Sequence, residues 1–107
     1  MKEIQDFIQS KWKFVWIETD HLDIYVRKSR RVQGQFLDIG SVTAKPTGKG
    51  IFSSALPGIL DIVRDSDLDG IYVECVLTAR FANFFRKNKW EELPCLGSPS
   101  FYLMLPR

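Results

Sequence analysis

The stretch Val42–Phe52, with the sequence VTAKPTGKGIF, decides the fold of this chain. An apolar strand runs into a loop that contains Gly48 and Gly50, and a helix follows the loop. Such a loop directs free backbone N–H groups and the positive end of the helix dipole toward one point. The stretch therefore predicts a binding site for an anion such as a pyrophosphate.

The composition is that of one soluble globular domain covering residues 1–107, because 45% of the residues are hydrophobic and 26% are charged. No apolar run approaches the roughly 18 to 20 residues of a membrane span. The segment Met1–Lys13 is amphipathic and charged, and it lacks the apolar core of a signal peptide. We therefore expect a cytoplasmic protein without a membrane partner. The two cysteines and the single histidine have no metal-ligand spacing, which argues against a metal centre.

Two clusters of basic residues, Arg27–Arg31 and Arg86–Lys89, stand out in a chain whose net charge is only +2. They are either the solvated ends of a strand and a helix, or contacts with the phosphates of nucleic acid or of a nucleotide cofactor. Aromatic and basic residues do not alternate as they do in single-strand binders. We therefore do not expect a nucleic-acid partner.

Hydrophobic periodicity predicts a helix, three strands, a helix, a strand, a helix and two strands. The predicted ranges are helix 2–11, strands 14–17, 21–27 and 36–44, helix 51–64, strand 71–77, helix 78–88, and strands 90–93 and 101–105. This order is typical of a mixed α/β (α+β) fold, in which helices flank a central twisted mixed sheet of about six strands.

The strand before the glycine loop has a mixed pattern. Leu37 and Ile39 share one face, and Phe36, Asp38 and Val42 share the other. Gly40 lies inside this strand, where a glycine often marks a β-bulge or the close approach of another group.

The element order and the loop resemble the GNAT (Gcn5-related N-acetyltransferase) superfamily, whose loop has the pattern Gln/Arg-x-x-Gly-x-Gly/Ala and follows a strand with a valine five residues earlier. Val42 falls at that valine and Gly50 at the central glycine. Thr47 replaces the Gln/Arg, and Phe52 replaces the second glycine. An alternative register over residues 45–50 keeps both glycines and a basic residue.

A second segment, residues 78–90, resembles the family pattern Asn-x-x-Ala-x-x-Phe/Leu-Tyr-x-Lys-x-Gly-Phe. Thr78 sits at the asparagine, Phe84 at the Phe/Leu and Trp90 at the final phenylalanine. Phe85 replaces the tyrosine that often protonates the departing CoA thiolate in this family. The two segments lie in the family's order with a strand between them, so the resemblance implies a compact GNAT-like fold, similar to small members from phage and bacterial genomes.

The resemblance also implies an acetyl-CoA (or CoA) cofactor and direct attack of an amine on the thioester. Backbone groups of Val42 and Ala44 would pair with the pantetheine arm, and amides of the loop and helix start would bind the pyrophosphate. The implied cofactor-binding residues are Val42, Ala44, Thr47, Gly48, Lys49, Gly50, Ile51, Phe52, Ser53, Thr78 and Phe85. Arg86 and Lys87 either contact the nucleotide phosphates or form a solvated helix face.

Two carboxylates are candidates for the general base. The family's glutamate position falls at Phe36, and Asp38 has the same strand parity two residues closer to the loop. Glu74, inside an apolar strand, is the second candidate, because a buried carboxylate is costly and its pKa shifts upward. The alternative for Glu74 is an ordinary ion pair with an arginine or lysine.

The function predicted first is an N-acetyltransferase acting on a small-molecule or protein amine. The alternative is a catalytically degenerate binding or regulatory module, motivated by Thr47, Phe52 and Phe85 and by a short N-terminal region. We also expect a homodimer, in which a second copy completes the sheet edge and the apolar face of helix 2–11.

Overall fold

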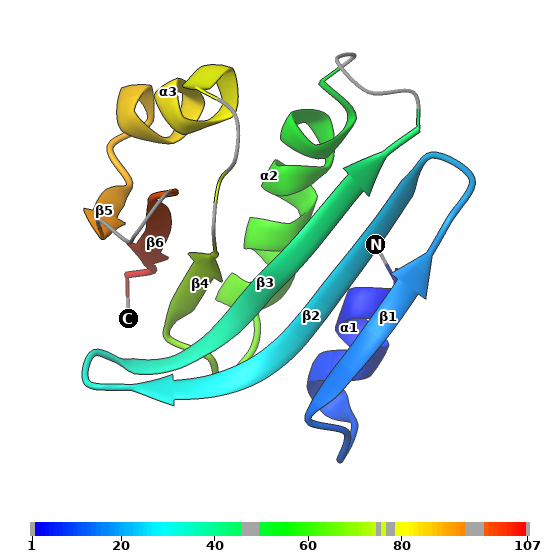
Figure 1. Ribbon diagram of the computed structural model, residues 1–107. Coiled ribbons are helices and arrows are strands. Elements are labelled where there is room, and N and C mark those ends of the chain that lie inside the picture. Colours follow the sequence, from blue (N-terminus) through cyan, green and yellow to red (C-terminus); the bar gives the residue numbers. More distant parts are fainter. Residues whose placement is uncertain (1, 46–49, 75, 77–78, 94–97, 107) are drawn as a thin grey trace.

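The computed structural model describes residues 2–45, 50–74, 76, 79–93 and 98–106. The elements are α1 (Lys2–Gln9), β1 (Phe14–Glu18), β2 (Leu22–Arg31), β3 (Gly34–Ala44), α2 (Ile51–Arg64), β4 (Gly70–Val73), α3 (Ala79–Lys87), β5 (Glu91–Leu93) and β6 (Ser100–Met104) (Figure 1). The predicted order of helices and strands is confirmed.

The six strands form one sheet in the order β1-β2-β3-β4-β6-β5. Every neighbouring pair is antiparallel except β3 and β4, which run parallel. Parallel neighbours need a crossover connection, and α2 provides it. The predicted mixed sheet is therefore confirmed.

Two helices, α1 and α2, lie on the same face of the sheet (Figure 1). Their buried residues recur at helical spacing, namely Ile4 and Phe7 in α1 and Phe52, Leu56, Ile59 and Val63 in α2. They join one core with the inward side chains of the strands. The other face of β1, β2 and β3 is turned toward the viewer in Figure 1, and no helix of the described residues crosses in front of it. None of the described helices combines the length and apolar character needed to cross a bilayer.

A β-bulge at Gly40 changes the faces of β3. At the Tyr25–Val26 step of β2 the register with β3 shifts, which leaves Gly40 as the extra residue. The predicted bulge is confirmed. Beyond it, Val42 pairs with Ile24, a fully buried residue of the core face. The prediction that Val42 shares the face of Asp38 is therefore wrong, because the bulge reverses the alternation.

Several element ends differ from their predicted positions. α1 ends at Gln9 rather than Lys11, and the paired part of β4 ends at Val73. β2 continues through the basic cluster to Arg31, and β3 begins at Gly34. A two-residue turn therefore joins longer strands than expected, because ion pairs described below allow the basic residues to lie within the sheet.

Candidate functional site

A fork between β3 and β4 is the main feature of the sheet. The strands pair until the Glu74 N–H donates to the Ile39 carbonyl, with 3.0 Å between nitrogen and oxygen. The Val76 N–H instead donates to the Pro99 carbonyl at 2.8 Å, while β3 continues to Ala44. Within the described ranges, the second half of β3 thus has no strand beside it on the β4 side.

The backbone of this unpaired half of β3 faces the fork at alternate residues. The Lys45 N–H donates to the His21 carbonyl at 2.9 Å. Hydrogen-bonded pairs alternate along an antiparallel ladder, so Thr43 directs its N–H and C=O toward β2. It follows that Val42 and Ala44 direct their N–H and C=O groups into the fork.

The N-terminus of α2 carries free amides. Gly50, at the N-cap, has φ 67° and ψ 25°, and no side chain caps the helix. A positive φ of this size favours glycine. The first intrahelical bond runs from the Ser54 N–H to the Gly50 carbonyl at 2.9 Å. The N–H groups of Ile51, Phe52 and Ser53 therefore have no acceptor within the helix, which suits an anion.

Space is open next to this helix start. Among the residues that the structure describes, a Cβ atom built on Gly50 would meet no heavy atom within 4 Å. Four of the predicted cofactor-binding residues, Thr47, Gly48, Lys49 and Thr78, lie outside the described residues. Their predicted contacts stay predictions.

Two residues that depart from the family pattern are core residues here. Phe52, only 4% exposed, packs edge to face on Phe81, with ring centroids 5.4 Å apart. Phe85 is fully buried, and its ring centroid lies 4.7 Å from that of Trp90 and 5.0 Å from that of Phe101. Packing in the core explains why a phenylalanine stands at position 85. The burial of this side chain does not favour the predicted contact with a cofactor.

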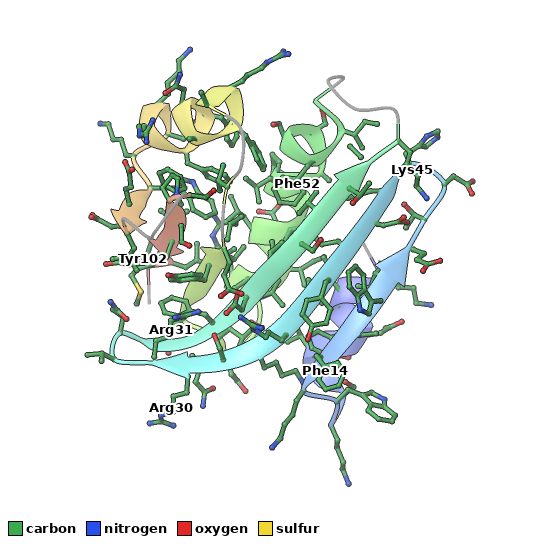
Figure 2. The ribbon with its side chains drawn as sticks, viewed as in Figure 1. Phe14, Arg30, Arg31, Lys45, Phe52 and Tyr102 are labelled. Atoms are coloured by element: carbon green, nitrogen blue, oxygen red, sulfur yellow. The ribbon has the colours of Figure 1, made fainter. Side chains whose placement is uncertain are left out.

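A cluster of four charged side chains lies on the uncovered face of the sheet. Asp38 is fully buried, and its Oδ2 accepts from Arg27 Nε at 3.3 Å and from a terminal nitrogen of Arg31 at 2.7 Å. Arg27 also donates to Glu74 Oε2. Arg31, labelled in Figure 2, also stacks on Tyr72, with Cζ 3.6 Å from the ring centroid. Both candidate bases are thus members of ion pairs, which for Glu74 is the alternative that the sequence left open.

The two carboxylates differ in what they can do. Asp38 has no exposed surface, and its Oδ1 has no hydrogen-bond partner among the described residues. Glu74 is 25% exposed. Burial raises the pKa of Glu74, and the neighbouring Asp38 carboxylate raises it further, whereas Arg27 and Arg31 act in the opposite direction. A partly exposed carboxylate whose pKa is raised is the better proton acceptor near neutral pH.

Glu74 stands at the base of the fork beside Gly40 and Tyr25. A Cβ atom built on Gly40 would lie 3.0 Å from Tyr25 Cδ2 and 3.5 Å from Glu74 Oε2. The absent side chain therefore allows a phenol and a carboxylate to approach the same point of β3. No pattern in the sequence indicates that Tyr25, Arg27 and Arg31 gather around these two carboxylates.

Arg86 is already paired at the end of α3. Its Nε and one terminal nitrogen donate to the two carboxylate oxygens of Glu92 at 2.8 and 2.9 Å. Both side chains are exposed enough for solvent to weaken the pair. The predicted contact of Arg86 and Lys87 with nucleotide phosphates stays a prediction.

No family model and no curated protein matches the sequence. Solved structures do resemble the fold. A mutant of the toxin AtaT, bound to the C-terminus of the antitoxin AtaR and to acetyl-CoA, matches with a TM-score of 0.56 at 14% identity, over 78% of this chain and 58% of that chain. Naa50 of Arabidopsis thaliana, in complex with the bisubstrate analogue CoA-Ac-MVNAL, matches with a TM-score of 0.54 at 17% identity, over 81% and 66%.

A complex of KacTA with DNA matches with a TM-score of 0.58 at 10% identity, over 85% of this chain and 65% of that chain. This chain therefore spans less than two thirds of the AtaT and KacTA chains. At such identities the likeness establishes the fold alone.

Proposed function

Because the chain has the fold of the GNAT acetyltransferases, we propose that it binds acetyl-CoA at the β3–β4 fork and transfers the acetyl group to an amine. The observation that carries this proposal is the coincidence of two backbone features. Val42 and Ala44 turn their amides and carbonyls into the fork, and the uncapped start of α2 follows β3 in the chain.

These backbone groups match the chemistry of the cofactor. An extended pantetheine arm carries amides that pair with a strand edge, as a peptide does in β-augmentation. Its pyrophosphate suits the free N–H groups of residues 51–53, and Gly50 leaves room for it. Bound acetyl-CoA supplies the activated acyl group as a thioester. The AtaT mutant was solved with acetyl-CoA and Naa50 with a CoA conjugate, which supports this choice of ligand.

Glu74 is the proposed general base. It lies at the base of the fork, it is partly exposed, and burial raises its pKa. Asp38, the first candidate from the sequence, is enclosed by Arg27 and Arg31 and has no surface from which to take a substrate proton. We assign Asp38 the role of positioning Arg27, which contacts both carboxylates.

No tyrosine is present at the position of the family's general acid, because that residue is the buried Phe85. A thiolate whose pKa is about 8 to 9 leaves without full protonation. The acceptor is proposed only as an amine of a small molecule or of a protein. Arg27 and Arg31 are engaged in ion pairs within the chain, which supports the expectation that this face does not bind nucleic acid.

The decisive test is calorimetric titration of the protein with acetyl-CoA, using two matched variants. Gly50→Trp puts an indole at the helix start, and Gly58→Trp puts one on an exposed position of the same helix, where a Cβ atom also meets nothing within 4 Å. We expect micromolar binding by the wild type and Gly58→Trp and none by Gly50→Trp. The absence of binding by the wild type at millimolar acetyl-CoA would overturn the proposal.

A second function, a degenerate binding or regulatory module, is favoured by the burial of Phe52 and Phe85. Phe52 and Phe85 are both buried in the core, so the fold would retain them even in a protein without catalytic activity. Measuring the release of CoA from acetyl-CoA with a thiol reagent, in the presence of candidate amines, distinguishes the acetyltransferase from the binding module. Binding without release for any amine, and no effect of Glu74→Gln, would support the module.

A further inference from the structure

The outer edge of β1 is open along its whole length. The Lys28 N–H donates to the Lys13 carbonyl, and the Thr19 N–H donates to the Leu22 carbonyl, both at 2.9 Å. These two bonds lie at the two ends of β1. They show that its odd-numbered residues direct their N–H and C=O groups toward β2. Phe14, Trp16 and Glu18 therefore direct their N–H and C=O groups outward. Among the described residues, nothing pairs with this edge.

Proteins often protect such an edge with a proline, a lysine or a bulge, and β1 has none of these three. The strand reads FVWIE, without a proline or a lysine, and its register with β2 has no bulge. Phe14 is 60% exposed and Trp16 is 59% exposed (Figure 2 labels Phe14 at the start of the strand). Strong strand formers with outward amides favour pairing with another strand.

A groove of about 480 Å³ runs beside this edge, between β1 and α1. Phe7, Val15 and Ile17 give it an apolar floor. Glu3, Asp6 and Glu18 also line it. A strand added to the edge of β1 would therefore also contact side chains of this groove.

Charge is distributed unevenly along the groove. α1 and β1 run in opposite directions (Figure 1), so the start of α1, with Glu3, lies toward the end of β1 that carries Glu18. Lys11 and Lys13, both exposed, precede the other end of the strand. An antiparallel second copy would bring its two lysines to the acidic end, and the same contact would recur by symmetry. A parallel copy would place like charges together.

We propose that the protein forms a two-fold symmetric dimer in which β1 pairs antiparallel with β1 of a second copy, centred on Trp16. Trp16 exchanges backbone hydrogen bonds with Trp16 of the partner subunit, and Phe14 does so with the partner's Glu18. Such an interface is isologous and closes after two copies. β2 separates β1 from β3, so the dimer leaves the β3–β4 fork open and does not depend on the proposed function.

The first test compares Trp16→Pro with Trp16→Val by light scattering at micromolar concentration. Proline removes an N–H that faces outward, so the β1–β2 ladder keeps its bonds. Valine removes the indole but keeps the N–H and a high strand propensity. We expect a mass of two chains for the wild type and Trp16→Val, and one chain for Trp16→Pro. A wild-type mass of one chain, or a Trp16→Pro variant that stays dimeric, would overturn the proposal.

A second test does not require the proline variant to fold. The Lys11→Glu/Lys13→Glu chain should repel itself at the acidic end of the groove, and the Glu3→Lys/Glu18→Lys chain should repel itself at the same place. We expect each variant alone to have the mass of one chain and an equimolar mixture to have the mass of two. Variants that each remain dimeric, or a mixture that stays monomeric, would contradict the antiparallel arrangement.

Discussion

Phe52 and Phe81 meet edge to face, with ring centroids 5.4 Å apart and ring planes at 87°. The contact joins the first turn of α2 to α3. Among the described residues no side chain caps α2, and Phe52 packs its first turn against α3, next to the amides of the proposed phosphate site.

Phe52→Ala should lower the free energy of unfolding by about 3 to 5 kcal/mol, because a buried phenylalanine leaves a cavity when it is truncated. The measurement is urea unfolding followed by circular dichroism. Val32→Ala is the matched control, since Val32 is fully exposed and its truncation should stay within about 0.5 kcal/mol. Equal effects of the two changes would contradict the packing described here.

Two glycine-to-alanine changes should have opposite signs. A Cβ atom on Gly70 would collide with the Leu103 carbonyl oxygen and the Phe36 ring, so Gly70→Ala should destabilise the protein by about 1 to 3 kcal/mol. Gly58 lies inside α2 with nothing within 4 Å of such an atom, so Gly58→Ala should stabilise it by about 0.5 to 1 kcal/mol. The midpoints of urea unfolding report both signs, and a loss of stability in Gly58→Ala would show that α2 is not helical there.

Asp38→Ala should destabilise the protein by about 1.5 to 3 kcal/mol, because it removes the buried acceptor of Arg27 and Arg31, whereas both arginines are partly exposed and Arg27 still pairs with Glu74. Asp38→Asn keeps the volume and removes the charge, so it separates packing from ion pairing. Urea unfolding at neutral pH measures both variants. A wild-type stability in Asp38→Asn would mean that the ion pairs contribute nothing.

The ion pair between Arg27 and Asp38 follows from the register of the β2–β3 hairpin, although neither residue type indicates it alone. With a two-residue turn at Val32-Gln33, the hairpin register places Arg27 opposite Asp38. Periodicity identified both strands, but the basic cluster looked like a solvated strand end because charge patterns do not reveal partners across a hairpin. Counting residue pairs outward from the two-residue turn places Arg27 directly opposite Asp38, so the register of the hairpin predicts this ion pair.

Other features could not be predicted from the sequence. The Gly40 bulge was expected, yet its effect on Val42 depends on which residue is left unpaired, and that is decided by packing on both sides of β3. The continuous apolar run after Gly70 predicted a long strand, whereas the fork begins at Glu74. Where parallel strands separate depends on tertiary contacts such as that of Val76 with Pro99, which no local pattern encodes.

The stability of the protein should depend on pH through the ionisation of Glu74. In the folded protein, burial and then the Asp38 carboxylate raise the pKa of Glu74, whereas in the unfolded chain it stays near about 4.3. The contribution of Glu74 to the free energy of unfolding is therefore fully present below that pH and is lost as the pH rises through the folded-state pKa. The difference in stability between the wild type and Glu74→Gln should fall across this window, and the carboxylates that do not interact with Glu74 cancel in the comparison. Urea unfolding at a series of pH values measures it. A difference that rises with pH would mean that Arg27 and Arg31 outweigh burial, and Glu74 would then be a poor candidate for the general base.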